Sequence, residues 1–382
     1  MEELIQNHAG KSIIHLYQRL WMWIRSTEGK IVWLSVGGHS LLHVLLLLFM
    51  PLAYYSELNG HDGDSYYALA QTPLPLHPAY TLMRYKRIFF PLFAKLTWPW
   101  DPHIGFAIAG IVGAALANLY FYRIASLYTP KPLRVTLVFA FSPYLFAATH
   151  IALPDPLSIA MVLAAFYYLL KNQFVEMTIC SALALLFKEV AAVSILALAI
   201  LTYRRMGLKR AALYLILVGL PTLVVVITYA HAWNDWLWYL KESRTTLVPA
   251  PVTLIKLLLN PGSTLIVRFD SLINMGVLIL LGYSLWRLRH DNRMILVFVI
   301  LSIIPLLFLD ERQYASDFDM VRQYMVAAPA LLVFTAGINR LRRSVFYMLL
   351  CGMSAYAMYY ILSTATFFVH YKQAILNLLP FK

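Results

Sequence analysis

The feature that most constrains this chain is a succession of apolar segments that continues almost from one end of the sequence to the other. A transmembrane helix needs roughly 20 apolar residues. With 61% hydrophobic and 13% charged residues, the 382-residue chain cannot be an ordinary soluble globule. No polar stretch between the apolar segments is long enough for a separate domain. The sequence therefore predicts an all-α integral membrane protein in which residues 1–382 form a single polytopic domain.

About eleven segments are expected to cross the membrane. The predicted spans are 31–55, 104–122, 133–151, 156–170, 174–187, 190–203, 211–230, 265–286, 294–309, 322–338 and 344–369. The division of residues 174–203 rests on charge. As one helix it would carry the basic cluster after residue 203 to the wrong side, whereas a break at Lys188-Glu189 keeps the basic loops on one side throughout.

The net charge of +13 could indicate nucleic-acid binding, but its distribution indicates membrane topology. With a cytoplasmic N-terminus, the inner loops hold the whole excess of basic residues and the outer side is neutral. The C-terminus then lies outside, and residues 1–30 form a cytoplasmic interfacial segment. The partners implied by this charge are membrane lipids, and no nucleic acid is expected.

The first outer loop, residues 56–103, is the densest polar region of the chain, and we expect interfacial helices in it. Asp62 and Asp64 precede a plausible helix start, so one of them can be an N-cap while the other carries chemistry. Arg84 and Arg87 are three residues apart and share a helix face. They either contact lipid headgroups or bind the phosphate of a lipid-linked substrate, which suits the guanidinium fork.

Five further ionisable residues interrupt the apolar pattern. His150 and Asp155 flank an outer turn, Lys188-Glu189 splits an apolar run, and Arg322 opens a late segment. The structural alternatives are a plain turn, a self-neutralising pair and a surface salt bridge. Ionisable groups at membrane depth usually mark a path or a site, and the short segments around them predict an outward-opening cavity.

The first outer loop resembles that of the polytopic C-type glycosyltransferases, both small bacterial members and the GPI mannosyltransferase branch. The resemblance rests on residues 61–70 (HDGDSYYALA) and 87–92 (RIFFPL). Three later features fit the same family: Pro154-Asp155-Pro156 at an outer turn, Lys188-Glu189 within an apolar run, and Arg322 at the start of a late helix. The resemblance implies a multi-pass protein, expected in a bacterial plasma membrane.

The resemblance also implies an activity. Such enzymes move a sugar, here expected to be of the hexosyl or mannosyl type, from a polyprenyl-phosphate donor on the non-cytoplasmic face, usually with inversion. The position of the family's first-loop base maps onto Asp62, and Asp64 is the alternative because the family pattern has no second acid there. The soluble domain of oligosaccharyltransferases is absent, which favours a lipid or glycan acceptor. The supporting residues expected around the cavity are His61, Tyr66, His150, Asp155 and Glu189.

Elementary chemistry points to the same division of roles. A lipid phosphate leaves as a stable anion, so the reaction needs a base for the acceptor hydroxyl and cations for the departing charge. The candidate cations are Arg84, Arg87, Lys188 and Arg322. The acids are scattered rather than clustered, so no cofactor or metal is required, and a loosely bound divalent ion is left open.

Two other classes of protein fit the same composition. A transporter or flippase of lipid-linked sugars would need charged residues along a path that reaches both faces. The short, basic inner loops favour a one-sided site instead. If the protein were a structural membrane subunit, the polar first loop would have no function.

Overall fold

The computed structural model describes residues 21–49, 61–71, 86–140, 153–236, 247–261 and 308–310, together with the single positions 145, 148, 149, 268, 271 and 298. These parts are helical apart from one antiparallel pair of three-residue strands, β1 (Leu247–Pro249) and β2 (Phe308–Asp310). The helical fold class is therefore confirmed for the described residues, with this small pairing as an addition that the sequence does not predict.

The helices follow the predicted apolar segments. They are α2 (Thr27–Phe49), α4 (His61–Gln71), α6 (Phe89–Thr97), α7 (Pro102–Tyr128), α8 (Pro132–Ala140), α10 (Asp155–Leu170), α11 (Phe174–Phe187), α12 (Ala191–Met206), α13 (Leu208–Trp233) and α14 (Ala250–Leu259). The predicted break is confirmed, because α11 ends immediately before Lys188 and α12 begins two residues after Glu189. Most of the four predicted spans after residue 264 lies outside the described residues.

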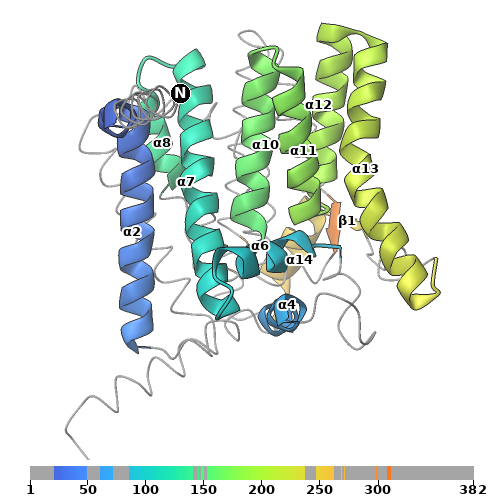
Figure 1. The fold of residues 1–382 in the computed structure, drawn as a ribbon, viewed down its shortest axis with the longest axis horizontal. Helices are drawn as coiled ribbons and strands as arrows, with labels where there is room; N and C mark the ends of the chain where they lie inside the picture. The colour runs from blue at the N-terminus through green and yellow to red at the C-terminus, as the bar shows by residue number, and fades with distance from the viewer. Residues whose placement is uncertain are drawn as a thin grey trace, which may run out of the picture.

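The helices α2, α7, α10, α11, α12 and α13 stand side by side, and α4 and α6 lie across one end of them (Figure 1). We call this the lower end, as Figure 1 shows it, and the opposite end the upper end. Packing joins α7 to α2, α6, α8 and α10, and joins α11 and α12 to α13. The chain runs from the upper to the lower end in α2, α11 and α13 and from the lower to the upper end in α7, α10 and α12, so that direction alternates from α10 to α13.

Short links reverse the chain between successive helices. Asn172 and Gly207 adopt positive φ angles of 60° and 87° at the two upper links, a conformation that Asn and Gly tolerate best. At the lower end, Asp101 caps α7 by accepting a hydrogen bond from the backbone N–H of His103 at 2.9 Å, and Pro102 occupies the first helical position. These local signals fix where each helix begins and ends.

Glycines allow α7 to approach its neighbours closely. A Cβ atom at Gly105 would lie 2.0 Å from the carbonyl oxygen of Ala94 in α6, and one at Gly113 would lie 2.7 Å from the backbone of α10. Gly110 makes a similar approach to the backbone at Thr149. Gly110 and Gly113 therefore allow close helix packing. Gly37 and Gly38 have no such role among the described residues, since nothing there lies within 4 Å of a Cβ at either position and α2 exposes both.

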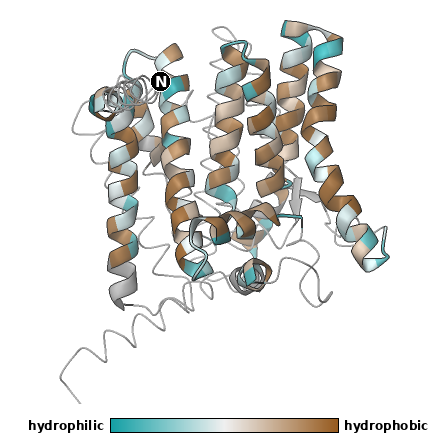
Figure 2. Ribbon diagram, viewed as in Figure 1, coloured by the Kyte–Doolittle hydropathy of each residue, from teal (hydrophilic) through white to brown (hydrophobic). Residues whose placement is uncertain are grey.

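Hydrophobic residues make up much of each long described helix (Figure 2). By length and composition, α7 and α13 are long enough and apolar enough to cross a membrane. In α13 only 17% of the most apolar window is buried, and residues such as Leu213, Ile216, Leu220 and Val224 are exposed. Exposed apolar surface on this scale marks contact with lipid or with another protein. The fold therefore supports membrane association.

Candidate functional site

The structure brings five of the predicted site residues to the lower end of the bundle with described side chains. They are Tyr66 of α4, Arg87 just before α6, Asp155 at the start of α10, and Lys188 and Glu189 in the link between α11 and α12. His61, Asp62 and Asp64 lie in the first turn of α4, which the structure describes at the level of the backbone. Arg84, His150 and Arg322 lie outside the described residues.

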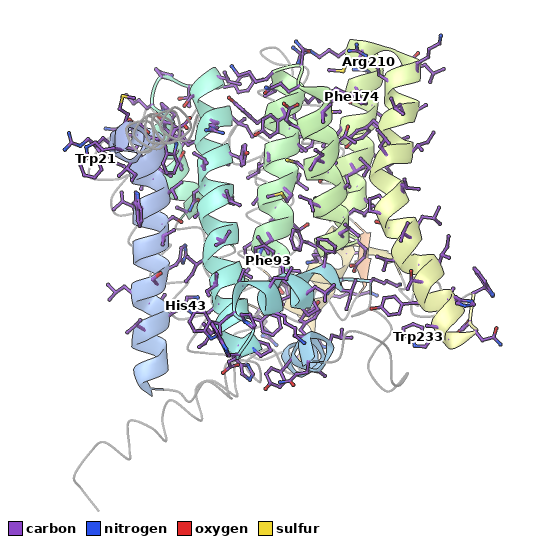
Figure 3. All side chains as sticks on the ribbon, viewed as in Figure 1. Trp21, His43, Phe93, Phe174, Arg210 and Trp233 are labelled. Atoms are coloured by element: carbon purple, nitrogen blue, oxygen red, sulfur yellow. The ribbon has the colours of Figure 1, made fainter. Side chains whose placement is uncertain are left out.

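An apolar cluster holds α4 and α6 against the bundle. Tyr66 meets Phe90 edge to face at 5.3 Å between ring centroids, and Phe90 packs on Phe106 of α7 at 5.1 Å. Phe93, labelled in Figure 3, meets Phe187 at the end of α11 edge to face at 6.0 Å. These aromatic contacts bury the surroundings of the ionic groups and exclude water from them.

Arg87 and Glu189 form a two-point ion pair inside this cover. The Arg87 Nη2 and Nε atoms donate to the two carboxylate oxygens of Glu189 at 2.5 and 2.8 Å. The Arg87 Nη1 atom donates to the Tyr66 hydroxyl at 3.1 Å. The side chain of Arg87 is 7% exposed and that of Glu189 is 23% exposed. The pair thus ties α4 and the start of α6 to the link between α11 and α12, more than 100 residues later.

Electrostatics fixes the charge states of this pair. Burial alone would raise the pKa of Glu189, but the Arg87 charge and its hydrogen bonds, with a contribution from Lys188, lower it to about 2. Burial likewise acts to lower the pKa of Arg87, and the Glu189 carboxylate outweighs it, so the pKa of the guanidinium is raised. Both groups are charged at any pH at which the protein would work.

Lys188 forms a second, deeper ion pair with Asp155. The Lys188 Nζ atom donates to Asp155 Oδ1 at 2.5 Å, and the two side chains are 8% and 2% exposed. Lys188 is extended at the end of α11, which turns its side chain toward α10 while Glu189 faces Arg87. The structural alternative considered for Lys188-Glu189, a self-neutralising pair, is therefore wrong, because each residue pairs with a partner from another element.

The four charges form an ionic cluster of two cations and two anions. Arg87 has five N–H donors, and its bonds to described residues use three of them. The cluster is preorganised, since the ion pairs and the apolar cover fix each side chain before any ligand arrives. The predicted binding of a donor phosphate by Arg87 and Lys188 stays a prediction, as does the outward-opening cavity.

Asp62 enters this arrangement through α4. The helix places it four residues, about one turn, before Tyr66. Asp62 therefore lies at the lower end, in the same helix as Tyr66, which contacts Arg87. The helix begins at His61, so both acids fall in its first turn, where a carboxylate is favoured by the helix dipole. The choice between Asp62 and Asp64 as base stays open at this level.

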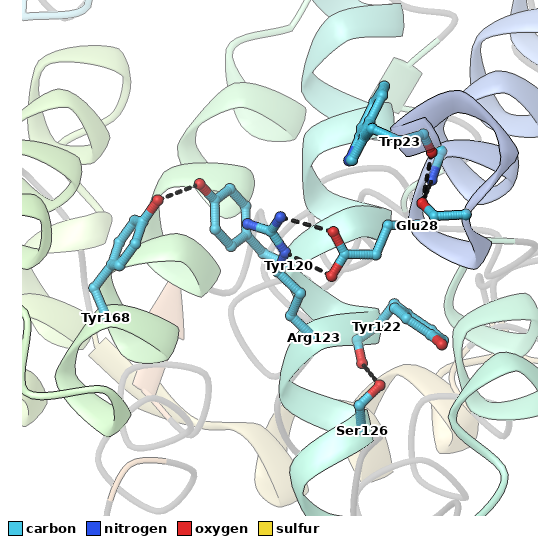
Figure 4. A network of polar contacts seen from close by, with 9 residues as sticks. Trp23, Glu28, Tyr120, Tyr122, Arg123, Ser126 and Tyr168 are labelled. Carbon is cyan, nitrogen blue, oxygen red and sulfur yellow. Dashed lines mark hydrogen bonds and ion pairs between the residues drawn. The ribbon is translucent and has the colours of Figure 1, made fainter. Parts of the chain in front are cut away.

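A second polar region, which the sequence analysis does not single out, joins α2 to α7. At the upper end, Arg123 donates from Nε and Nη2 to the carboxylate of Glu28 at 3.0 and 2.8 Å, and Tyr120 shares a hydrogen bond with Tyr168 (Figure 4). Further along the same interface, Asn118 donates to Ser35 at 2.9 Å. The signal in the sequence was polar residues at helical spacing in an apolar segment: Ser35, His39 and His43, all buried.

The acids and histidines of the described residues do not gather in groups of three or more that would hold a metal ion. Comparison with known proteins adds no assignment, since no protein-family model matches the chain and no curated protein matches it. The site is therefore interpreted from its own geometry and from the resemblance of the first outer loop.

Proposed function

We propose that this protein is a membrane glycosyltransferase of the C-type class, which moves a sugar from a polyprenyl-phosphate donor to a lipid or glycan acceptor. The observation that carries the proposal is the buried ionic cluster at the end of the bundle where α4, with Asp62 in its first turn, lies across the helix ends. Buried charges are costly, so a fold that places three of them together with the partly buried Glu189 at one end of the bundle favours a functional role.

The proposed reaction needs one base and one cationic region. The Asp62 carboxylate takes the proton of the acceptor hydroxyl, the hydroxyl oxygen forms a bond to the anomeric carbon, and the bond from that carbon to the phosphate oxygen breaks with inversion. The departing electron pair stays on the lipid phosphate. Arg87, with donors still available among the described contacts, stabilises this anion in a region with little water. Lys188 holds Asp155 and adds positive potential.

The proposed topology follows the charges at the two ends. The upper ends of the described helices carry most of the exposed basic residues: Arg25, Lys30, Lys131, Lys171, Arg204, Arg205, Lys209 and Arg210. Among the described acids, Asp62, Asp64, Asp101, Asp155, Glu189 and Asp235 lie toward the lower end, whereas Glu28 and Glu176 lie at the upper end. This bias supports a cytoplasmic upper end and an outer lower end. We extend it to a multi-pass protein with about eleven crossings, an outside C-terminus and a bacterial plasma-membrane location.

Asp62→Asn tests the proposal most directly. With purified protein in liposomes and a polyprenyl-phosphate sugar as donor, we expect sugar transfer to fall by about 10³-fold, because a positioned general base contributes between 10² and 10⁴. Asp64→Asn is the matched control in the same helical turn and should keep most of the activity. Unfolding midpoints of both variants should match the parent protein. Full turnover by the Asp62 variant would remove this residue as the base, and loss in Asp64→Asn alone would move the role there.

A transporter or flippase of lipid-linked sugars is the second candidate, and the polar interface between α2 and α7 favours it. This interface runs from Glu28 and Arg123 near the upper end through Ser35 and Asn118 toward His43, which Figure 3 shows near the lower end. A transport pathway between the two faces of a membrane requires a row of polar residues of this length. Movement of a labelled lipid-linked sugar across liposomes, without transfer to an acceptor, would establish this reading instead.

A further inference from the structure

An apolar groove lies between α12 and α13. It begins at Val193, four residues after Glu189 of the ionic cluster, and runs toward the upper end. The groove has a volume of about 560 Å³ and is lined by side chains that include Val193, Leu196, Ile200, Ala212 and Leu215. Its lining is almost wholly apolar, and both helices expose further apolar residues around it. From Val193 to Tyr203 the groove follows about 15 Å of helix.

Basic side chains stand at the upper end of this groove. Tyr203 and Leu208 line its last turn, and Arg204, Lys209 and Arg210 next to them are exposed. Figure 3 shows Arg210 at the upper end of α13. Within the described part of the chain these three residues form no ion pair, although Glu176 lies in the first turn of α11 at the same end. Arg205 instead donates to the carbonyl oxygen of Leu169 at 3.1 Å.

We propose that this groove binds an anionic phospholipid, with one acyl chain between α12 and α13 and the headgroup phosphate on Arg204, Lys209 and Arg210. Charge complementarity selects this occupant. An apolar trough alone would accept any chain, but a trough that ends in unpaired cations favours a ligand with an apolar body and a negative head. Basic pockets between membrane helices on the cytoplasmic side bind anionic headgroups in this way. Guanidinium groups add paired donors for the phosphate oxygens.

The position of the groove suggests a consequence for the fold. The link between α12 and α13 is the single residue Gly207, with φ of 87°, so the two helices separate directly below a tight turn. A bound chain would fill the space between them and hold the angle of α13. This inference rests on the membrane location but not on sugar transfer, so its test has a different readout from the Asp62 experiment.

The test is native mass spectrometry of the full chain in detergent, titrated with phosphatidylglycerol or phosphatidylcholine of the same chain length. We expect tighter binding of phosphatidylglycerol. The triple variant R204Q/K209Q/R210Q should weaken it by about 100-fold, because each basic side chain near an anionic group contributes about fivefold. The control R25Q/K131Q/K171Q removes the same charge from exposed positions at the same end, away from the groove, and should bind within about twofold of the parent.

A groove-filling change keeps the proposal falsifiable if the charge variant folds poorly. Ala212→Trp fills the apolar groove without altering charge, whereas Leu213→Trp places the same side chain at an exposed position of α13 outside the lining. Binding should be lost in the first variant and kept in the second. Equal affinity for the two lipids, or equal losses in the groove variants and their controls, would overturn the proposal.

Discussion

The protein contains two arginine–glutamate pairs with nearly the same geometry and different surroundings. Arg87 and Glu189 pair at the lower end, and Arg123 and Glu28 pair at the upper end, each through two N–H donors. The lower pair is 7% and 23% exposed, and the upper pair is 25% and 30% exposed. The lower pair also contacts Tyr66 and lies next to a second buried ion pair. The upper pair lies beside two tyrosine rings and joins only α2 to α7.

The geometry of an ion pair alone does not indicate its function. A half-exposed pair such as Arg123–Glu28 is screened by solvent and contributes little to stability. A buried pair is costly to form and costly to disrupt, because the remaining partner keeps its charge without solvation. We therefore infer that the upper pair fixes one helix contact. The lower pair fixes the positions of the groups on which the proposed chemistry depends.

Neutralising one acid in each pair gives the largest expected contrast. Glu189→Gln leaves Arg87 buried beside a neutral group and should lower the free energy of unfolding by about 3–5 kcal/mol. Glu28→Gln removes the matching charge at the upper end and should cost about 1 kcal/mol or less. Chemical unfolding in detergent micelles measures both. Equal losses would mean that the two environments are equivalent and that burial does not distinguish the pairs.

The sequence predicts the helices better than it predicts the contacts between them. The bounds of α10, α11 and α12 follow from the prolines, the short apolar runs and Lys188-Glu189, all of which act locally. The partners of Lys188 and Glu189 are Asp155 and Arg87. Only tertiary packing brings these partners close. The sequence pattern singles out Arg87 and Glu189, but cannot show that they neutralise each other. Their mutual neutralisation also means that Arg87→Ala would test stability and donor binding together.

Acidification should reduce the difference in the free energy of unfolding between the parent protein and Glu189→Gln. The folded-state pKa of Glu189 is about 2, below its ordinary value of 4.5. The unfolded state therefore takes up the proton first, so the stabilisation is complete above about pH 4.5 and is lost as the pH falls toward 2. The complete loss should be on the order of 3 kcal/mol, of which about 2 kcal/mol falls between pH 6 and pH 3. Unfolding of parent and Glu189→Gln at pH 6 and pH 3 measures it, because other titrating groups affect both proteins alike.

A pH-independent difference would contradict the assignment. It would mean that the pKa of Glu189 is the same in the folded and unfolded states, so that its pairing with Arg87 contributes nothing to stability. Buffers and detergent must be the same at both pH values, since the comparison depends on a difference of two unfolding free energies.

The smallest expected effect concerns the tyrosine that completes the lower pair. Tyr66→Phe removes the hydroxyl that accepts from Arg87 and keeps the ring against Phe90, so it should cost about 2 kcal/mol, as expected for a hydrogen bond to a charged group. Tyr67→Phe is the control in the same helix. Its hydroxyl accepts from Gln71 at 2.9 Å in an exposed position, so its loss should cost about 0.5 kcal/mol or less.

Combining Tyr66→Phe with Glu189→Gln separates a network from two independent contacts. Tyr66 and Glu189 bind the same guanidinium, so removal of one partner changes the strength of the contact between Arg87 and the other partner. Residues in one network show interaction energies between about 0.5 and 3 kcal/mol. We therefore expect the double variant to differ by at least this lower amount from the sum of the single changes, and the matching combination with Tyr67→Phe to be additive. Additive free energies in both combinations would show that the lower cluster consists of separate contacts, as at the upper end. The proposed site would then lack the preorganisation on which it depends.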